Sequence, residues 1–333
     1  MERSKVTIEE VAKMSGVSRG TVSRVLNDSL NVKSSTRKRV LEVIELIGYR
    51  PNIHARRTAG GKSYTVSVIL PMIGTEFYAR LVKGIEEKLR SQWHAPILFP
   101  LLSREWLAWL MRPDSPAYDA DGIILCSLIP ERLYPSGYLP TERPVVLVDS
   151  YSPAYDSVYL DNELGGYLAG QHLVQNEGDI YVISMQEKTE APFARVFHKR
   201  LIGFRQALQE VGRKLPENHI YAYDFSWSAG YLATREILQQ SNPPVNIFAI
   251  CDLFALGVIK EVMRAGLQLG KDVRVIGFDD HPWAAEWGIT SIRQPIEEMG
   301  KIAAEILLNR LQDDESSIHN VCFKPELVVR QSA

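Results

Sequence analysis

Apolar residues near the N-terminus recur at the spacing of an α-helix and are then interrupted. The first stretch opens with a capping box, in which Thr7 and Glu10 can each satisfy a free backbone N–H of the first turn. Gly16 follows the stretch, and glycine readily adopts the left-handed turn that ends a helix. Ser18 can cap a second helix that reaches Asn27. This pattern predicts a helix, a tight turn and a second helix.

The second helix is expected to bury Val22 and Val25 and to expose a small, basic face. That face consists of Arg19, Gly20, Ser23, Arg24 and Asn27. Arginine can bind guanine through two acceptors in the major groove, while hydroxyl and backbone N–H groups hold phosphates. An ordinary helical hairpin with a solvated basic face accounts for the same residues. The helix pair alone leaves both interpretations open.

A third helix is expected to end at Gly48. Three hydroxyl residues are candidates for its N-cap, namely Ser34, Ser35 and Thr36. Its inner face is predicted to consist of Val40, Leu41, Ile44 and Ile47. Basic residues occupy the outer side of its first turn, at Arg37, Lys38 and Arg39. Positive charge there opposes the helix dipole, which favours an anionic partner.

Charge is divided unevenly along the chain. Residues 1–60 hold 12 Lys and Arg against 6 Asp and Glu, whereas the remainder holds 26 against 34. A net charge of −2 for all 333 residues therefore conceals a basic head and an acidic body. This asymmetry points to nucleic acid as the partner of the head alone. Residues 51–62 predict either a short hinge helix that touches DNA or a plain linker.

From Tyr64 onward, short β-branched stretches alternate with amphipathic helical stretches. The predicted strands are residues 65–70, 96–100, 122–127, 145–148, 180–184, 219–223, 246–250 and 273–278. Apolar strands that alternate with helices predict an α/β fold of two doubly wound lobes, each with a parallel sheet covered on both faces. Ligands of such folds bind beyond the carboxyl ends of the strands. The loops that follow the strands are therefore expected to converge on one cleft.

Composition narrows the class of protein. The chain is 45% apolar and 23% charged, and its first residues lack the apolar stretch of a signal peptide, so a cytoplasmic protein is expected. The three cysteines, Cys126, Cys251 and Cys322, are too widely spaced to suggest a disulfide framework or a zinc cluster. Hydrolase, metalloprotease and nucleotide-binding motifs are absent from the sequence. We expect neither an enzyme nor a metal or cofactor.

The first 62 residues resemble the DNA-binding head and hinge of the lactose/galactose-repressor (LacI/GalR) family of bacterial transcription regulators. The resemblance rests on TIEEVAKMSGVSRGTVSRVLN at 7–27 and STRKRVLEVIELIGYRPN at 35–52. The body resembles the same family through LDNELGGYLAGQHL at 160–173, RLIGFRQAL at 200–208 and VRVIGFDD at 273–280. This family resemblance implies a helix-turn-helix head (1–50), a hinge (51–62) and a core (63–333) similar to periplasmic sugar-binding proteins.

The resemblance also assigns roles in DNA binding. Base reading falls to Arg19, Gly20 and Arg24, and backbone positioning to Thr7, Ser18, Thr21, Ser23, Asn27 and Thr36. The hinge candidates are Asn52, Ala55, Arg56 and Thr58. Family members usually carry a leucine wedge where this chain has Thr58, and such wedges kink the DNA. We expect weaker operator bending here, and a gel-based bend measurement that showed an equal kink would contradict this.

By the same resemblance, an effector site is expected between the lobes. The candidates are Tyr78, Cys126, Arg195, His198, Phe225, Cys251 and Asp279. Core packing is the alternative role for the two aromatic residues. His198 stands where the family's effector-binding arginine is expected, and Cys251 replaces an asparagine, so neither can make the same paired contact. Arg195 is one turn earlier and could substitute. These departures put a simple sugar in doubt.

The expected function is a sequence-specific transcription regulator, a repressor that acts as a homodimer on a palindromic DNA operator. A small-molecule effector in the cleft would change the geometry of the lobes and release the hinge. The chain carries no trailing heptads, which favours a dimer over a tetramer. Two alternatives remain. The body could be controlled by a partner protein or a non-sugar ligand, or it could be an enzyme or solute binder with an incidental head.

Overall fold

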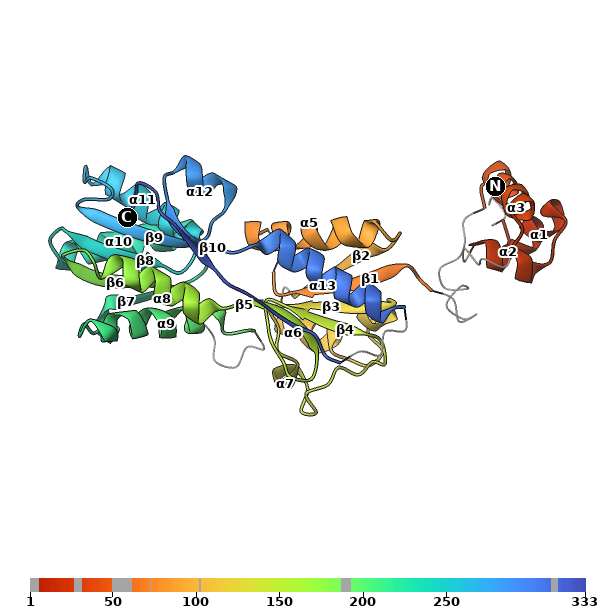
Figure 1. Ribbon diagram of the computed structural model, residues 1–333, viewed down its shortest axis with the longest axis horizontal. Coiled ribbons are helices and arrows are strands. Elements are labelled where there is room, and N and C mark those ends of the chain that lie inside the picture. The colour runs from red at the N-terminus through yellow and green to blue at the C-terminus, as the bar shows by residue number, and fades with distance from the viewer. Residues whose placement is uncertain are drawn as a thin grey trace. The chain divides into compact units, whose positions relative to one another are not determined.

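The chain forms two compact units, Met1–Tyr64 and Thr65–Ala333. The structure is a computed structural model that describes residues 6–26, 32–49, 62–72, 74–101, 103–186, 193–312 and 317–333. The first unit is the red segment of Figure 1, and the second runs from orange to blue. Among the described residues, no helix has the length and apolar character needed to cross a membrane.

The first unit, which we call the head, packs three helices on a small apolar core. They are α1 (Ile8–Ser15), α2 (Arg19–Leu26) and α3 (Ser34–Ile47). The predicted capping box is present, since the backbone N–H of Thr7 donates to Glu10 Oε2 at 2.8 Å and Glu10 N–H donates to Thr7 Oγ1 at 3.4 Å. Gly16 ends α1 with a φ of 64°. The helix, turn and helix expected from the sequence are confirmed.

Two details of α3 differ from expectation. Its N-cap is Lys33, which makes no side-chain cap bond, so the predicted hydroxyl cap is wrong and Ser34 is already helical. Leu41, predicted to be internal, is 48% exposed. Val40 is fully buried, and Leu41 projects about 100° further around the helix, which places it on the flank of the buried stripe.

The second unit, which we call the body, contains two six-stranded sheets, one in each lobe. Lobe 1 has the order β11-β5-β4-β3-β1-β2, and lobe 2 has the order β12-β10-β9-β8-β6-β7. Lobe 1 contains β1 (Thr65–Leu70), β2 (Ala95–Pro100), β3 (Gly122–Cys126), β4 (Val145–Val148), β5 (Asp156–Leu160) and β11 (Asn320–Phe323). Lobe 2 contains β6 (Asp179–Met185), β7 (Ile220–Tyr223), β8 (Val245–Ala249), β9 (Val273–Asp279), β10 (Thr290–Arg293) and β12 (Glu326–Val328). The pairs are parallel except β10 with β12, which confirms the predicted doubly wound lobes.

Helices cover both faces of the sheets. Lobe 1 carries α5 (Glu76–Arg90), α6 (Arg104–Leu110), α7 (Pro130–Leu133) and α13 (Ile296–Arg310). Lobe 2 carries α8 (Asn162–Leu173), α9 (Val196–Glu210), α10 (Trp227–Gln240), α11 (Asp252–Arg264) and α12 (Pro282–Glu286). Although they are far apart in sequence, α5 and α13 lie side by side (Figure 1). The last helix of the chain therefore returns to the first lobe.

The lobes are joined by three chain crossings and by direct contacts. The crossings follow β5, β10 and β11, and the last includes Pro325, which cannot continue a strand ladder. Trp283 Nε1 of lobe 2 donates to Glu76 Oε2 of lobe 1 at 3.0 Å, and the Ala194 N–H donates to the carbonyl of Ser127 at 2.8 Å. These contacts connect the two lobes directly in this structure.

Candidate DNA-reading helix and ligand cavity

The outward face of α2 carries the residues that the sequence assigned to base reading. Arg19, Gly20 and Arg24 are exposed, while Thr21 and Ser23 are half-buried. Arg24 Nε donates to the Gly20 carbonyl at 3.2 Å, and Arg19 Nη1 lies 2.9 Å from Glu9 Oε1. Ion pairs between exposed groups contribute little, so these contacts are easily exchanged for DNA acceptors.

The remaining head candidates lie at helix starts. Ser18 Oγ accepts from the backbone N–H of Thr21 at 3.1 Å at the start of α2, and Thr7 caps α1. Thr36 is half-buried in the first turn of α3. Backbone N–H groups at helix N-termini suit phosphate. Five predicted contacts lie outside the described residues: Asn27, Asn52, Ala55, Arg56 and Thr58.

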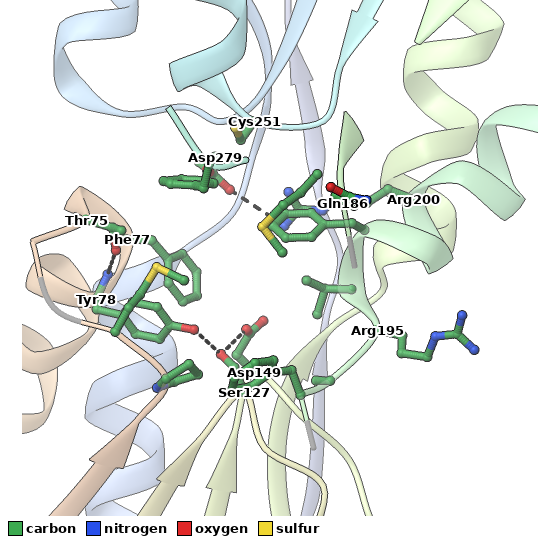
Figure 2. Close-up of a pocket in the computed structure, with 18 of the residues that line it drawn as sticks. Thr75, Phe77, Tyr78, Ser127, Asp149, Gln186, Arg195, Arg200, Cys251 and Asp279 are labelled. Carbon is green, nitrogen blue, oxygen red and sulfur yellow. Dashed lines mark hydrogen bonds and ion pairs between the residues drawn. The ribbon is translucent and has the colours of Figure 1, made fainter. Parts of the chain in front are cut away.

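A cavity of about 200 Å³ lies between the carboxyl ends of the strands of the two lobes. Figure 2 shows Tyr78, Ser127 and Asp149 on one side of this space and Asp279 and Cys251 on the other. Its apolar wall includes Phe77, Met185, Phe193, Val196, Phe197 and Phe225. The loops that follow the strands therefore meet in one cleft, as their positions in the sequence indicated.

Five of the seven predicted effector residues line the cavity, namely Tyr78, Arg195, Phe225, Cys251 and Asp279. Figure 2 shows the guanidinium of Arg195 directed away from the others. The prediction is wrong for Cys126, which is fully buried in β3, because side chains alternate along a strand and Ser127 faces the cavity instead. It is also wrong for His198, which is exposed on α9 and does not line the cavity.

Arg200 lines the cavity and was missed by the sequence analysis. Only 3% exposed, it donates from Nε to Asn162 Oδ1 at 2.8 Å and from Nη1 to the Ile250 carbonyl at 2.6 Å. Its Nη2 lies 3.6 Å from Asp279 Oδ1, and its guanidinium lies 3.5 Å from the ring centroid of Phe278. Helical spacing offered a signal, since Arg200 stands three residues before Gly203, on the buried face of α9.

Lobe 1 supplies a buried chain of hydrogen bonds. Tyr78 Oη donates to Ser127 Oγ at 2.9 Å, and Ser127 Oγ donates to Asp149 Oδ2 at 2.5 Å. Burial raises the pKa of Asp149 to about 6, against the lowering effects of the Ser127 hydrogen bond and the charge of Arg200. Burial likewise raises the pKa of Tyr78, which keeps its hydroxyl protonated as a donor.

Three residues that line the cavity have strained backbone conformations. Ser127, Asp149 and Asp279 have φ values of 52°, 57° and 110°, in the region that favours glycine. Each such conformation costs roughly 1–3 kcal/mol and persists only where the surroundings enforce it. The three residues follow or end strands of both lobes, so the strain aims their side chains into the cavity.

Asp149→Asn should stabilise the body at neutral pH. An aspartate titrates near 3.9 in an unfolded chain, as a rule of thumb, but Asp149 titrates at about 6 in the fold. As the pH rises through this window the unfolded chain loses its proton first, so stability falls until the folded-state pKa is passed. The variant should gain about 2–3 kcal/mol at pH 7.5 and nothing at pH 4. Urea unfolding at both pH values measures this, with Asp114→Asn, at an exposed site, as control. An equal change at both pH values would contradict it.

Comparison with known proteins agrees with this architecture. Residues 7–52 match the family profile of bacterial regulatory proteins, lacI family, and residues 179–333 match a periplasmic binding protein-like domain. Catabolite control protein A of Priestia megaterium is 32% identical over 331 residues, which cover 98% of this chain and 99% of that protein.

Solved structures of transcription regulators are also similar to this chain over most of its length. A probable transcription regulator from Thermus thermophilus is 46% identical, with a TM-score of 0.71, over 80% of this chain and 97% of its own. The transcriptional regulator CelR in complex with cellobiose is 29% identical, with a TM-score of 0.71, over 98% of this chain and 100% of its own.

A helix-turn-helix head followed by a two-lobed body with a cavity between the lobes defines a DNA-binding transcription regulator. The chain belongs to the LacI family of bacterial regulatory proteins. The family resemblance and the α/β fold class inferred from the sequence are both confirmed.

Proposed function

We propose that the protein is a repressor that binds a palindromic operator as a homodimer, with an affinity set by a small molecule in the cavity. The observation that carries the proposal is the exposed face of α2, where Arg19 and Gly20 lie in the first turn and Arg24 follows in the last turn, next to Gly20. In a dimer, two such helices would read two half-sites one helical turn apart. The matched relatives are regulators, so the proposal assigns the chain no catalysis.

The cavity supports control by a ligand. Both lobes contribute to its lining, so a bound molecule would contact both and favour one lobe geometry over another. CelR, whose solved complex holds cellobiose, shows that a relative binds a small molecule. Coupling between such sites is typically about 1–3 kcal/mol, or roughly 5–150-fold in DNA affinity.

Operator selection from random DNA, repeated with metabolites present, tests this function. A clear consensus with two symmetric half-sites is the expected result. If no duplex is preferred over bulk competitor DNA at physiological salt, the proposed function is wrong.

Arg24→Ala should weaken binding to the selected operator by about 1–3 kcal/mol, because a base-reading arginine loses two hydrogen bonds. Discrimination should relax at one base pair in each half-site, while affinity for random DNA stays nearly unchanged. Fluorescence anisotropy on both duplexes measures the effect. Arg112→Ala, which removes an exposed arginine of the body, is the control. An equal loss on random DNA would make Arg24 a phosphate contact instead.

A further inference from the structure

The cavity is unusually apolar for a site that would recognise a sugar. Of the 19 lining residues in the described part of the chain, 11 are apolar or aromatic, counting Tyr78 and Cys251. A sugar presents hydroxyl groups around its ring, and each must find a partner when it leaves water. Sites that select hydroxyls supply buried polar groups matched to them.

Most of the polar groups at this cavity are already engaged within the protein. Ser127 bridges Tyr78 and Asp149, and Thr75 Oγ1 accepts from the Tyr78 backbone N–H at 3.4 Å. Asp279 Oδ1 accepts from Gln294 Nε2 at 2.5 Å and lies 3.6 Å from Arg200 Nη2, and Arg200 also donates to Asn162 and to the Ile250 carbonyl. These groups therefore retain only part of their capacity to satisfy a ring of hydroxyl groups, and the other polar lining residues are Arg132, Gln186 and Arg195.

Size restricts the ligand further. The cavity measures about 200 Å³. An engineered apolar cavity of about 150 Å³ holds benzene. The enclosed part of the cavity therefore has room for one small ring system with short substituents.

The Asp149 carboxylate is a polar group of the cavity wall that can receive a ligand. Only one of its oxygens, Oδ2, accepts from Ser127, and a carboxylate can accept several hydrogen bonds. It is 5% exposed and faces the space across from Asp279 and Cys251 (Figure 2). A donor on the ligand would meet a buried acceptor, which makes the bond both strong and selective.

We propose that the cavity takes a ligand the size of one small ring system, with an apolar body and a hydrogen-bond donor that faces Asp149. This inference rests on the proposed function, because it specifies the effector of that regulator. The apolar body packs on Phe77, Met185 and Phe225, and the donor distinguishes the ligand from purely apolar molecules of the same shape.

Calorimetry on the full-length protein tests the inference with four probes: indole, 1-methylindole, ribose and glucose. Indole carries one N–H donor, and 1-methylindole is the same ring without it. Indole should bind at least about 10-fold more tightly than 1-methylindole, since hydrogen bonds to charged groups are the stronger ones. Both indoles should bind more tightly than either sugar. Asp149→Asn should narrow the difference between the indoles to less than about threefold.

Two control variants separate the contacts from general effects on folding. Phe225→Ala should weaken both indoles to a similar extent, because it removes part of the apolar wall. Tyr221→Phe, on β7 and outside the cavity lining, should leave all four affinities unchanged. A melting temperature for each variant confirms that it is folded.

Each outcome decides a part of the inference. Tighter binding of either sugar than of the indoles overturns the apolar body, and equal binding of the two indoles overturns the contact with Asp149. Operator titrations on the same samples distinguish a failure of this inference from a failure of the proposed function. If the operator is bound but no indole binds at millimolar concentration, this inference fails alone. If no operator is preferred, the proposed function fails whatever the indoles do.

Discussion

Arg200→Leu is expected to destabilise the body by about 3–5 kcal/mol, because breaking a buried ionic cluster leaves its other members uncompensated. The substitution would strip hydrogen bonds from Asn162 Oδ1 and from the Ile250 carbonyl, and would leave Asp279 without its nearby cation. Urea unfolding followed by tryptophan fluorescence measures the effect. All 6 tryptophans lie in the body, so the signal reports that unit.

Arg205→Leu is the matched control, since Arg205 lies on the same helix and pairs at the surface with Glu217. It should change stability by less than about 1 kcal/mol. The double variant Arg200→Leu with Asp279→Asn should recover part of the loss, because it removes the stranded carboxylate. A loss of less than about 1 kcal/mol for Arg200→Leu, or no recovery in the double variant, would show that the cluster is not coupled in this way.

Arg200 also shows why the cavity could be predicted only in part. The position of Tyr78, Phe225 and Asp279 follows from topology, because residues after parallel strands meet at one sheet edge. Arg200 follows His198 and Lys199 in a polar stretch that resembles a solvated helix start, and only its spacing from Gly203 indicates the buried face. Its burial depends on Asn162, Ile250 and Asp279, which are 38 to 79 residues away in the chain. The local sequence pattern gives no information about partners that lie so far away in the chain.

The same limit explains the strands that the sequence analysis missed. β5 begins with Asp156 and Ser157, which do not look like a buried strand. Both are buried in the structure, where Arg310 Nε lies 2.8 Å from Asp156 Oδ2. By contrast, β1 is rich in β-branched and apolar residues, and its range was predicted as 65–70. Hydrophobic periodicity predicts helices and strands that bury only apolar side chains. It does not predict an element such as β5, in which a buried polar side chain pairs with a charged residue far away in the sequence.

Gly166→Ala should cost about 3 kcal/mol, at the upper end of what overpacking a core typically costs. A Cβ added at Gly166 of α8 would overlap the carbonyl oxygen of Arg200 in α9, and one added at Gly203 would overlap the carbonyl oxygen of Glu163. The two helices therefore pack backbone against backbone, and neither carbonyl is the flexible end of a side chain. To admit one methyl group, α9 must move away from α8. That movement would carry Arg200 out of reach of Asn162, which stands at the start of α8.

Gly166→Ala should therefore weaken ligand binding as well as lower the free energy of unfolding. Urea unfolding measures the change in the free energy of unfolding. The control is Gln171→Ala, an exposed substitution on the same helix, whose stability should stay within about 0.5 kcal/mol of the parent protein. A ligand found for the cavity should bind Gly166→Ala more weakly than the parent at a temperature where both are folded. Operator binding by the head, which is a compact unit of its own, should persist without ligand. A variant as stable as the parent would mean that α8 and α9 are not in backbone contact.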